Sequence, residues 1–213
     1  MSGFNFEKNL NHQTRAVEAA VSVFEGLNIQ QPIVTEKQFV NPTIDYEIGF
    51  GYITNIKNIQ AKNSIKEDIN GNSNTIDIMM ETGTGKTYTY AKTIFELNKN
   101  FGIFKFVVVV PTLSIKAGTI DFLESDSSRE HFKEQYGKTL KLHIVESKKN
   151  KKNKKSYMPA AINSFVNAGT FEKNQIQVLI INTGMINSST MQEGFDRSLF
   201  DKYSVPYEAI SAT

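Results

Sequence analysis

The sequence has no cysteine and only three histidines among its 213 residues. The absence of cysteine excludes disulfide frameworks, thiolate metal sites and cysteine nucleophiles, and it is typical of a reducing compartment. Three scattered histidines also disfavour a zinc site, which needs several nitrogen or sulfur ligands close together. Neither thiol-dependent nor zinc-dependent chemistry is therefore expected.

Long apolar runs are missing as well. No stretch approaches the roughly 18 consecutive apolar residues that a membrane-spanning helix requires. Residues 1–10 are polar and lack the apolar centre of a signal peptide. We therefore expect a cytoplasmic protein with no membrane association.

What is present is an ordinary globular composition, with 39% hydrophobic and 22% charged residues and a net charge of +2. Six of the 24 Lys and Arg residues fall within residues 148–155. Without these six, 18 basic residues stand against 22 acidic ones, which leaves a net charge of −4. A chain that is mildly acidic outside one lysine-rich loop (147–156) is unlike a general polyanion binder, so we expect any nucleic-acid contact to be local.

Apolar runs alternate with helical patterns along the chain, which indicates βαβ units and a parallel sheet. Expected helices cover residues 13–27, 86–99, 113–123 and 157–168, and expected strands cover residues 75–80, 104–110, 140–145 and 177–181. Residues 29–70 are interrupted by prolines and glycines, and we expect an irregular, partly β insertion there. The predicted fold class is α/β, with a mostly parallel sheet and helices on both faces.

A glycine-rich segment joins the expected strand 75–80 to the expected helix 86–99. Its sequence is Glu81-Thr82-Gly83-Thr84-Gly85-Lys86-Thr87. Glycines permit tight turns and a close approach of backbone N–H groups to phosphate, and the following helix presents its positive end. Lys86 can reach the β- and γ-phosphates of ATP, and Thr87 can offer its hydroxyl to Mg2+. The predicted nucleotide-binding residues are Thr82, Gly83, Thr84, Gly85, Lys86 and Thr87.

The strict phosphate-loop pattern, G-x-x-x-x-G-K-S/T, is broken at one position, because Met80 stands where the first glycine belongs. An ordinary glycine turn before a helix is the alternative interpretation. The expected strand before the segment and the expected helix after it supply the context of a phosphate loop, and they favour the ATP site.

Residues 80–87 resemble the first motif of superfamily 2 helicases and translocases, in which the leading glycine is often replaced. Together with residues 88–90 and 96–99, they are similar to the Res subunit of type III restriction enzymes. Residues 106–119 are similar to that family's motif Ia, and residues 10–19 resemble its upstream glutamine motif. The three motifs occur in the family's order over most of the chain.

The resemblance implies a RecA-like P-loop NTPase domain that uses ATP and Mg2+. It gives Lys86 the catalytic role of stabilising the transferring phosphate, and it has Gln13 read the adenine edge. It implies nucleic-acid contacts by motif Ia, at Pro111, Thr112, Gly118 and Thr119. The implied activity is ATP hydrolysis coupled to cleavage of double-stranded DNA, with a DNA methyltransferase (modification) subunit as partner.

A carboxylate pair expected of such an ATPase is missing. These enzymes use it to hold Mg2+ and to polarise the attacking water, whereas the apolar run 178–181 is followed by Asn182-Thr183-Gly184. In the resembled family the acidic motif would fall after Thr213. We therefore expect residues 1–213 to be an N-terminal fragment of a longer subunit. We expect this fragment alone to bind ATP weakly and not to turn it over appreciably.

Several of these residues also have a plain structural interpretation. The lysine-rich loop is more readily read as solvated than as a DNA contact. Thr112 and Thr119 could cap the next helix as readily as contact a nucleic-acid backbone. Thr183 could belong to a further backbone-contacting motif or to a turn. Gln13, without the resemblance, would be an ordinary surface or capping residue.

Other functions stay open on sequence grounds. Another superfamily 2 motor, such as a type I restriction translocase or an RNA helicase, would differ in its acidic and nuclease motifs. A module that senses ATP without hydrolysis would lack the acidic pair altogether. A P-loop kinase is disfavoured, because motif Ia and the long insertion have no place in it.

Overall fold

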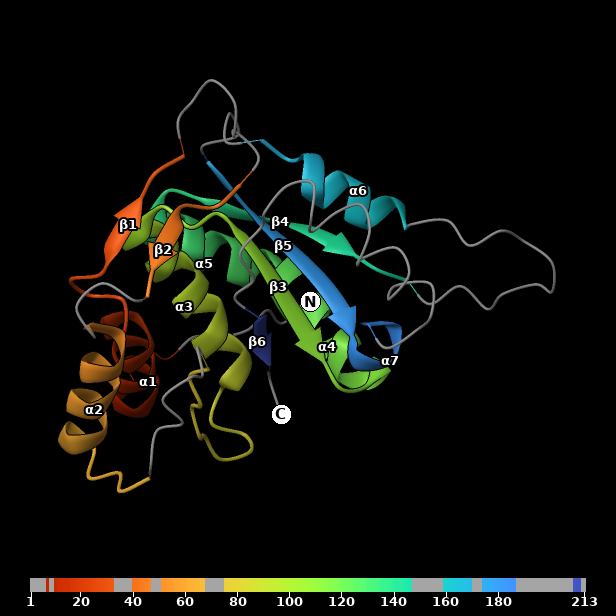
Figure 1. Ribbon diagram of the computed structural model, residues 1–213. Coiled ribbons are helices and arrows are strands. Elements are labelled where there is room, and N and C mark those ends of the chain that lie inside the picture. The colour runs from red at the N-terminus through yellow and green to blue at the C-terminus, as the bar shows by residue number, and fades with distance from the viewer. Residues whose placement is uncertain are drawn as a thin grey trace. The chain divides into compact units, whose positions relative to one another are not determined.

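The computed structural model describes residues 7, 10–32, 40–46, 51–67, 75–146, 159–169, 174–186 and, by backbone alone, 209–211. Its contacts divide the chain into two compact units. The sheet unit comprises Met1–Asn5, Pro32–Asn41 and Gly102–Thr213, and the loop unit comprises Phe6–Gln31 and Pro42–Phe101. Figure 1 shows the helices and strands of both units.

The sheet unit is built on parallel strands in the order β4-β5-β3-β6. The strands are β3 (Lys105–Val110), β4 (Thr139–Ile144), β5 (Gln175–Asn182) and β6 (Ala209–Ser211). β5 lies between β4 and β3, with Val178 opposite both Leu142 and Phe106 (Figure 1). Residues 176–181 are all buried, because a central strand of a parallel sheet is covered on both faces.

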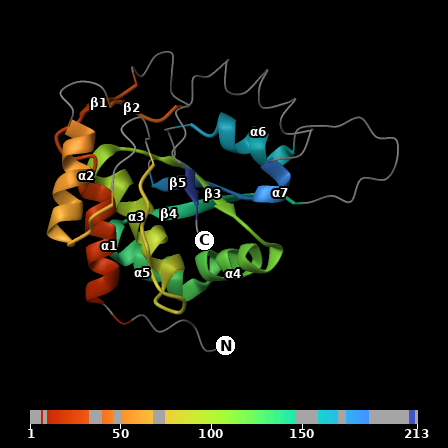
Figure 2. The same ribbon diagram turned by 60° about the horizontal axis from the view of Figure 1, so that its bottom comes forward.

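Helices cover both faces of this sheet (Figure 2). On one face, α6 (Ala160–Asn167) packs Ile162 and Phe165 against Leu179 and Ile181 of β5. On the other face, α4 (Leu113–Glu124) and α5 (Asp126–Tyr136) contact β5 and β4. The short helix α7 (Thr183–Ile186) directly follows β5. The predicted α/β class, with a parallel sheet between helices, is confirmed.

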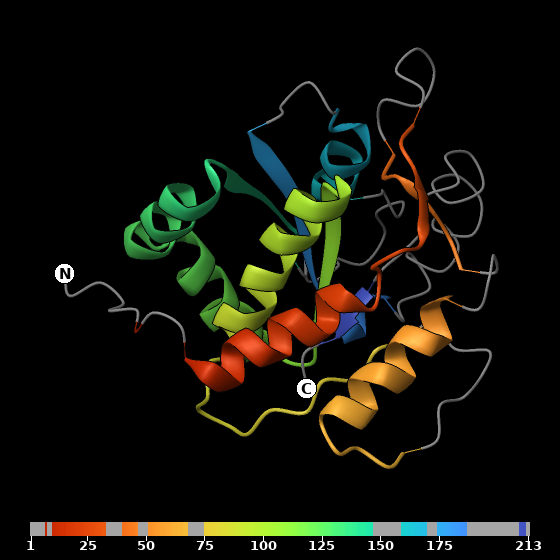
Figure 3. The same cartoon turned by 90° about the vertical axis from the view of Figure 1, so that its left-hand side faces the viewer.

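The loop unit combines helices with an antiparallel strand pair. Its elements are α1 (Asn11–Ser22), β1 (Asn28–Gln30), β2 (Thr43–Asp45), α2 (Gly51–Lys62) and α3 (Lys86–Phe101). α1 packs across α3 and also contacts α2 (Figure 3). Val17 and Ala20 are buried on one side of α1, and Phe24, in the turn after the helix, is buried as well. The Phe24 ring lies 5.8 Å from that of Phe101, at the end of α3.

Residues 75–80, which the sequence predicts as a strand, form none. They pair with no described strand, and Ile78 and Met79 are 43% and 95% exposed. Alternating apolar residues form a strand only where a neighbouring strand supplies hydrogen bonds. Both sides of β3 are already occupied, by β5 and by β6.

A helix inside the predicted irregular insertion is a second difference. α2 occupies residues 51–62, where Tyr52, Ile56 and Ile59 recur at helical spacing. The antiparallel pairing of β1 with β2 matches the β-structure expected elsewhere in the insertion. The glycines and prolines near α2 concealed this helical period in the sequence.

α5 is also absent from the predicted elements, because residues 126–136 are mostly polar. Its cap is Ser125, which accepts a hydrogen bond from the Ser128 N–H at 3.3 Å. A narrow stripe that includes His131 and Phe132 is buried. No helix in the described ranges of the chain is long and apolar enough to cross a membrane.

Candidate functional site

The segment before α3 folds into a tight loop that Thr84 closes. The Thr84 hydroxyl donates to the Glu81 carbonyl at 2.6 Å, and the Thr84 N–H donates to the same oxygen at 3.4 Å. Gly83 and Gly85 have φ angles of +83° and +86°, in the left-handed region that residues with a Cβ rarely adopt. The backbone conformation of the loop therefore requires glycine at both positions.

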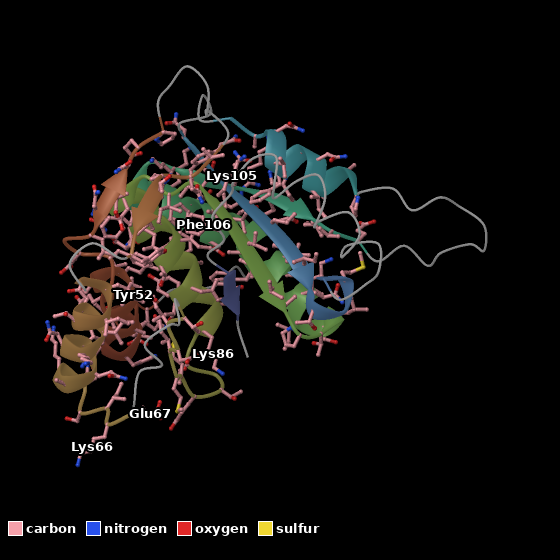
Figure 4. All side chains as sticks on the ribbon, viewed as in Figure 1. Tyr52, Lys66, Glu67, Lys86, Lys105 and Phe106 are labelled. Carbon is pink, nitrogen blue, oxygen red and sulfur yellow. The ribbon has the colours of Figure 1, made fainter. Side chains whose placement is uncertain are left out.

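α3 begins directly after this loop. The Thr89 N–H donates to the Gly85 carbonyl at 3.0 Å, so Gly85 stands at the cap position of the helix. N–H groups in the first turn of a helix have no acceptor within it and carry its positive end, which suits an anion. Lys86 and Thr87 are the first two residues of α3, both partly exposed, and Figure 4 shows Lys86 where the loop meets the helix. The arrangement places an ammonium and a hydroxyl beside an anion-binding backbone.

The first turn of α1 contacts the same loop. His12 Nε2 and Gln13 Nε2 each lie 3.0 Å from the carbonyl oxygen of Thr84. Gln13 is only 7% exposed, and a Cβ added to Gly85 would collide with its amide nitrogen. A Cβ at residue 85 would therefore have to displace the Gln13 amide, in addition to the strain of a left-handed φ.

In the sheet unit, a side chain joins the carboxyl ends of β3 and β5. The Thr183 hydroxyl donates to the Pro111 carbonyl at 3.4 Å, and Thr183 begins α7. Thr112 caps α4, because its hydroxyl oxygen accepts a hydrogen bond from the Ile115 N–H at 3.2 Å. Of the two interpretations of Thr112, the structure shows the cap, and its nucleic-acid contact stays a prediction.

Motif Ia includes one residue whose predicted contact the structure does not support. Pro111, Thr112 and Gly118 are exposed, whereas Thr119 is 3% exposed. Thr119 belongs to the buried side of α4 together with Lys116, one turn earlier. Burial prevents the Thr119 side chain from reaching a nucleic-acid backbone, and Thr119 does not cap the helix either, since it lies in the middle of α4.

Comparison with known proteins decides the family. The family model described as type III restriction enzyme, res subunit, matches residues 52–205, which is most of the chain. The chain belongs to the Res subunit family of type III restriction enzymes.

Individual Res subunits are similar over nearly the whole chain. The chain is 50% identical to the type III restriction-modification enzyme EcoP15I Res subunit of Escherichia coli and 49% identical to the EcoPI Res subunit of Escherichia phage P1. It is 34% identical to the StyLTI Res subunit of Salmonella typhimurium. The alignments cover 99%, 99% and 97% of this chain but 22%, 22% and 19% of these relatives. The chain thus spans about a fifth of the length of the Res subunits that it matches.

The Res glutamine motif and the phosphate loop meet in the structure. Gln13 lies against Thr84 and Gly85, while its predicted adenine contact stays a prediction. Thr82 is exposed in the turn of the loop. His12 lies within the glutamine motif but was not among the predicted site residues, although two adjacent hydrogen-bonding side chains at the start of a helix were a visible signal.

Metal ligands are scarce among the described residues, which contain no cluster of three or more His, Asp or Glu side chains suited to a metal ion. The Thr87 hydroxyl is a hard oxygen ligand of the kind that Mg2+ prefers, so it fits the predicted role. β5 ends at Asn182, whose Oδ1 is buried without a hydrogen-bond partner, and no carboxylate follows directly. The lysine-rich loop lies outside the described residues.

Proposed function

We propose that the chain is the ATP-binding motor part of a Res subunit, which couples ATP hydrolysis to cleavage of double-stranded DNA together with a DNA methyltransferase subunit. The loop before α3 carries this proposal, because Gly83 and Gly85 take left-handed φ angles and lead into a helix that starts with Lys86 and Thr87. Family membership supports it, since the similar Res subunits belong to restriction-modification enzymes.

Each residue of the loop has its own proposed role in binding ATP. The backbone of Gly83, Thr84 and Gly85 cradles the β- and γ-phosphates, with the Gly83 and Gly85 N–H groups as the donors, because the Thr84 N–H donates to Glu81 within the loop. The Lys86 ammonium stabilises the negative charge of the transferring phosphoryl group. The Thr87 hydroxyl holds Mg2+, which when bound supplies further neutralisation of phosphate charge. Gln13, beside the loop, is the proposed reader of the adenine edge.

The proposed DNA-facing surface lies at the carboxyl end of β3. Pro111, Thr112 and Gly118 are exposed there, and the Thr112 hydroxyl can donate a hydrogen bond to a DNA phosphate while its oxygen caps α4. The hydrogen bond from Thr183 to Pro111 fixes this end of β3 to the end of β5. Such contacts position a duplex without reading its sequence.

Equilibrium binding of a fluorescent ATP analogue in the presence of Mg2+ tests the proposal. Lys86→Ala should weaken binding by about 10- to 100-fold, because a hydrogen bond from a charged group contributes roughly 1.5–3 kcal/mol. Lys99→Ala, which makes the same charge change in the last turn of α3, is the matched control and should bind like the wild type. Equal affinities of Lys86→Ala and wild type, or a wild type that does not bind, would sink the proposal.

A further inference from the structure

Two neighbouring side chains of α1 converge on a single carbonyl oxygen of the phosphate loop. His12 and Gln13 each place Nε2 3.0 Å from the oxygen of Thr84. A carbonyl oxygen only accepts hydrogen bonds, so His12 must carry a proton on Nε2. The oxygen has two lone pairs and can accept both bonds at once.

This contact fixes the orientation of the peptide unit between Thr84 and Gly85. A trans peptide is planar, and its N–H points in the opposite direction to its C=O. Since both side chains hold the carbonyl toward α1, the Gly85 N–H is turned away from α1, at the cap position of α3. An N–H in that place adds a donor to those of the first helical turn, where a phosphate would bind.

Such a restraint matters because the glycines of the loop have high conformational freedom. Thr84 stands between two glycines with positive φ, and glycine loses more conformational freedom than any other residue when it is ordered. A loop whose peptide orientation is fixed beforehand loses less entropy on binding a ligand. The packing of Gln13 directly against Gly85 shows how closely α1 confines this part of the loop.

We propose that His12 is a positioning residue for ATP binding, acting with Gln13 through the Thr84 carbonyl to aim the Gly85 N–H at the bound phosphate. The inference rests on the proposed function, and it assigns His12 a role that requires no contact with the nucleotide. It also commits the Nε2 of Gln13 to the loop, which leaves the Oε1 for the predicted adenine contact.

The test measures binding of a fluorescent ATP analogue with Mg2+ to the full 213-residue chain and three variants. His12→Phe keeps a ring and removes the donor, whereas His12→Gln restores an N–H at a similar reach. Arg15→Met is the matched control, because the hydrogen bond of Arg15 runs from α1 to Asn63 Oδ1 at 2.6 Å and not to the loop. This control removes a hydrogen bond that anchors α1 elsewhere.

His12→Phe should weaken binding by about three- to tenfold, as expected for one neutral hydrogen bond. His12→Gln and Arg15→Met should stay near wild-type affinity. With 15N-glycine labelling, the Gly85 amide resonance reports the peptide directly. ATP should shift this resonance in the wild type and in His12→Gln, and much less in His12→Phe.

Each other outcome overturns the inference in its own way. Wild-type affinity and a wild-type Gly85 shift in His12→Phe would remove the positioning role and leave the proposed function standing. Equal weakening in His12→Phe and Arg15→Met would show that His12 only anchors α1. A wild type that does not bind the analogue would overturn the proposed function, and the role of His12 with it.

Discussion

Lys105 is a buried lysine at the first position of β3 (Figure 4). It is 5% exposed, and its ammonium donates to the Val166 carbonyl at 2.6 Å. The nitrogen also lies 5.6 and 5.7 Å from the ring centroids of Phe104 and Phe165. Loss of hydration in this setting lowers the pKa of Lys105 from 10.5 to about 8. The carbonyl and the rings therefore offset only part of the cost of burying the charge.

The lowered pKa of Lys105 gives a signed pH prediction. Between pH 8 and 10.5 the native state has lost the proton while the unfolded chain keeps it, so wild-type stability gains up to about 1.4 kcal/mol per pH unit from this group. The burial cost is fully present below pH 8. Lys105→Met lacks this contribution, so its free energy of unfolding relative to wild type should fall as the pH rises through this window.

Urea unfolding of both proteins between about pH 7 and about pH 10 measures this difference. Lys133→Met, on the exposed side of α5, is the control and should follow the wild-type pH profile. Parallel profiles for Lys105→Met and wild type would contradict the prediction, whatever the absolute stabilities.

At the scale of elements, Thr112 at the start of α4 has two roles. It caps the helix, and it is a proposed contact to DNA. Thr112→Val removes the capping acceptor and should lower the free energy of unfolding by about 1 kcal/mol. Thr112→Asp keeps an acceptor at the cap but adds a negative charge, so stability should hold while DNA affinity falls. Chemical unfolding and a DNA titration of both variants separate the roles. Wild-type DNA affinity in Thr112→Asp would contradict the DNA contact and leave the cap in place.

The helices and strands that could be predicted are those whose pattern is visible in their own consecutive residues. The apolar runs within β3 and β5 and the glycines at either end of α3 identify these elements without knowledge of their neighbours. Residues 75–80 failed as a strand because a strand also needs a partner, which the local pattern does not supply. α2 and α5 were missed because polar residues and nearby turn formers conceal their narrow buried stripes.

The candidate site likewise has features that the local sequence predicts and features that depend on how distant residues pack. The phosphate loop was predictable, because its glycines, lysine and threonine act within seven consecutive residues. The contact of His12 with Thr84 was not, since it joins residues 72 positions apart and depends on how α1 packs. The burial of Thr119 likewise depends on which side of α4 faces the interior, and a motif pattern does not report that.

At the scale of the whole molecule, one segment accounts for the net positive charge of the chain. Without the six lysines of residues 148–155, the chain has a net charge of −4. Such a body does not attract a polyanion overall, so the proposed DNA binding would depend on local contacts. The exposed residues at the end of β3 and the lysine-rich loop are two candidates for these contacts. Salt dependence distinguishes them, because each lysine that neutralises a phosphate releases counterions.

We predict that the lysine-rich loop is not a principal DNA contact and is dispensable for nucleotide binding. Six lysines within eight residues repel one another, and no apolar residue stands among them in the sequence, so fixing them costs conformational entropy. Replacing all six with serine should leave both ATP-analogue affinity and the slope of log DNA affinity against log salt unchanged. A lysine that binds a phosphate adds about 0.9 to the magnitude of this slope. If all six lysines bound phosphates, replacing them would therefore lower the magnitude by about 5 units. A fall of several units, with ATP-analogue binding intact, would make this loop a main DNA contact.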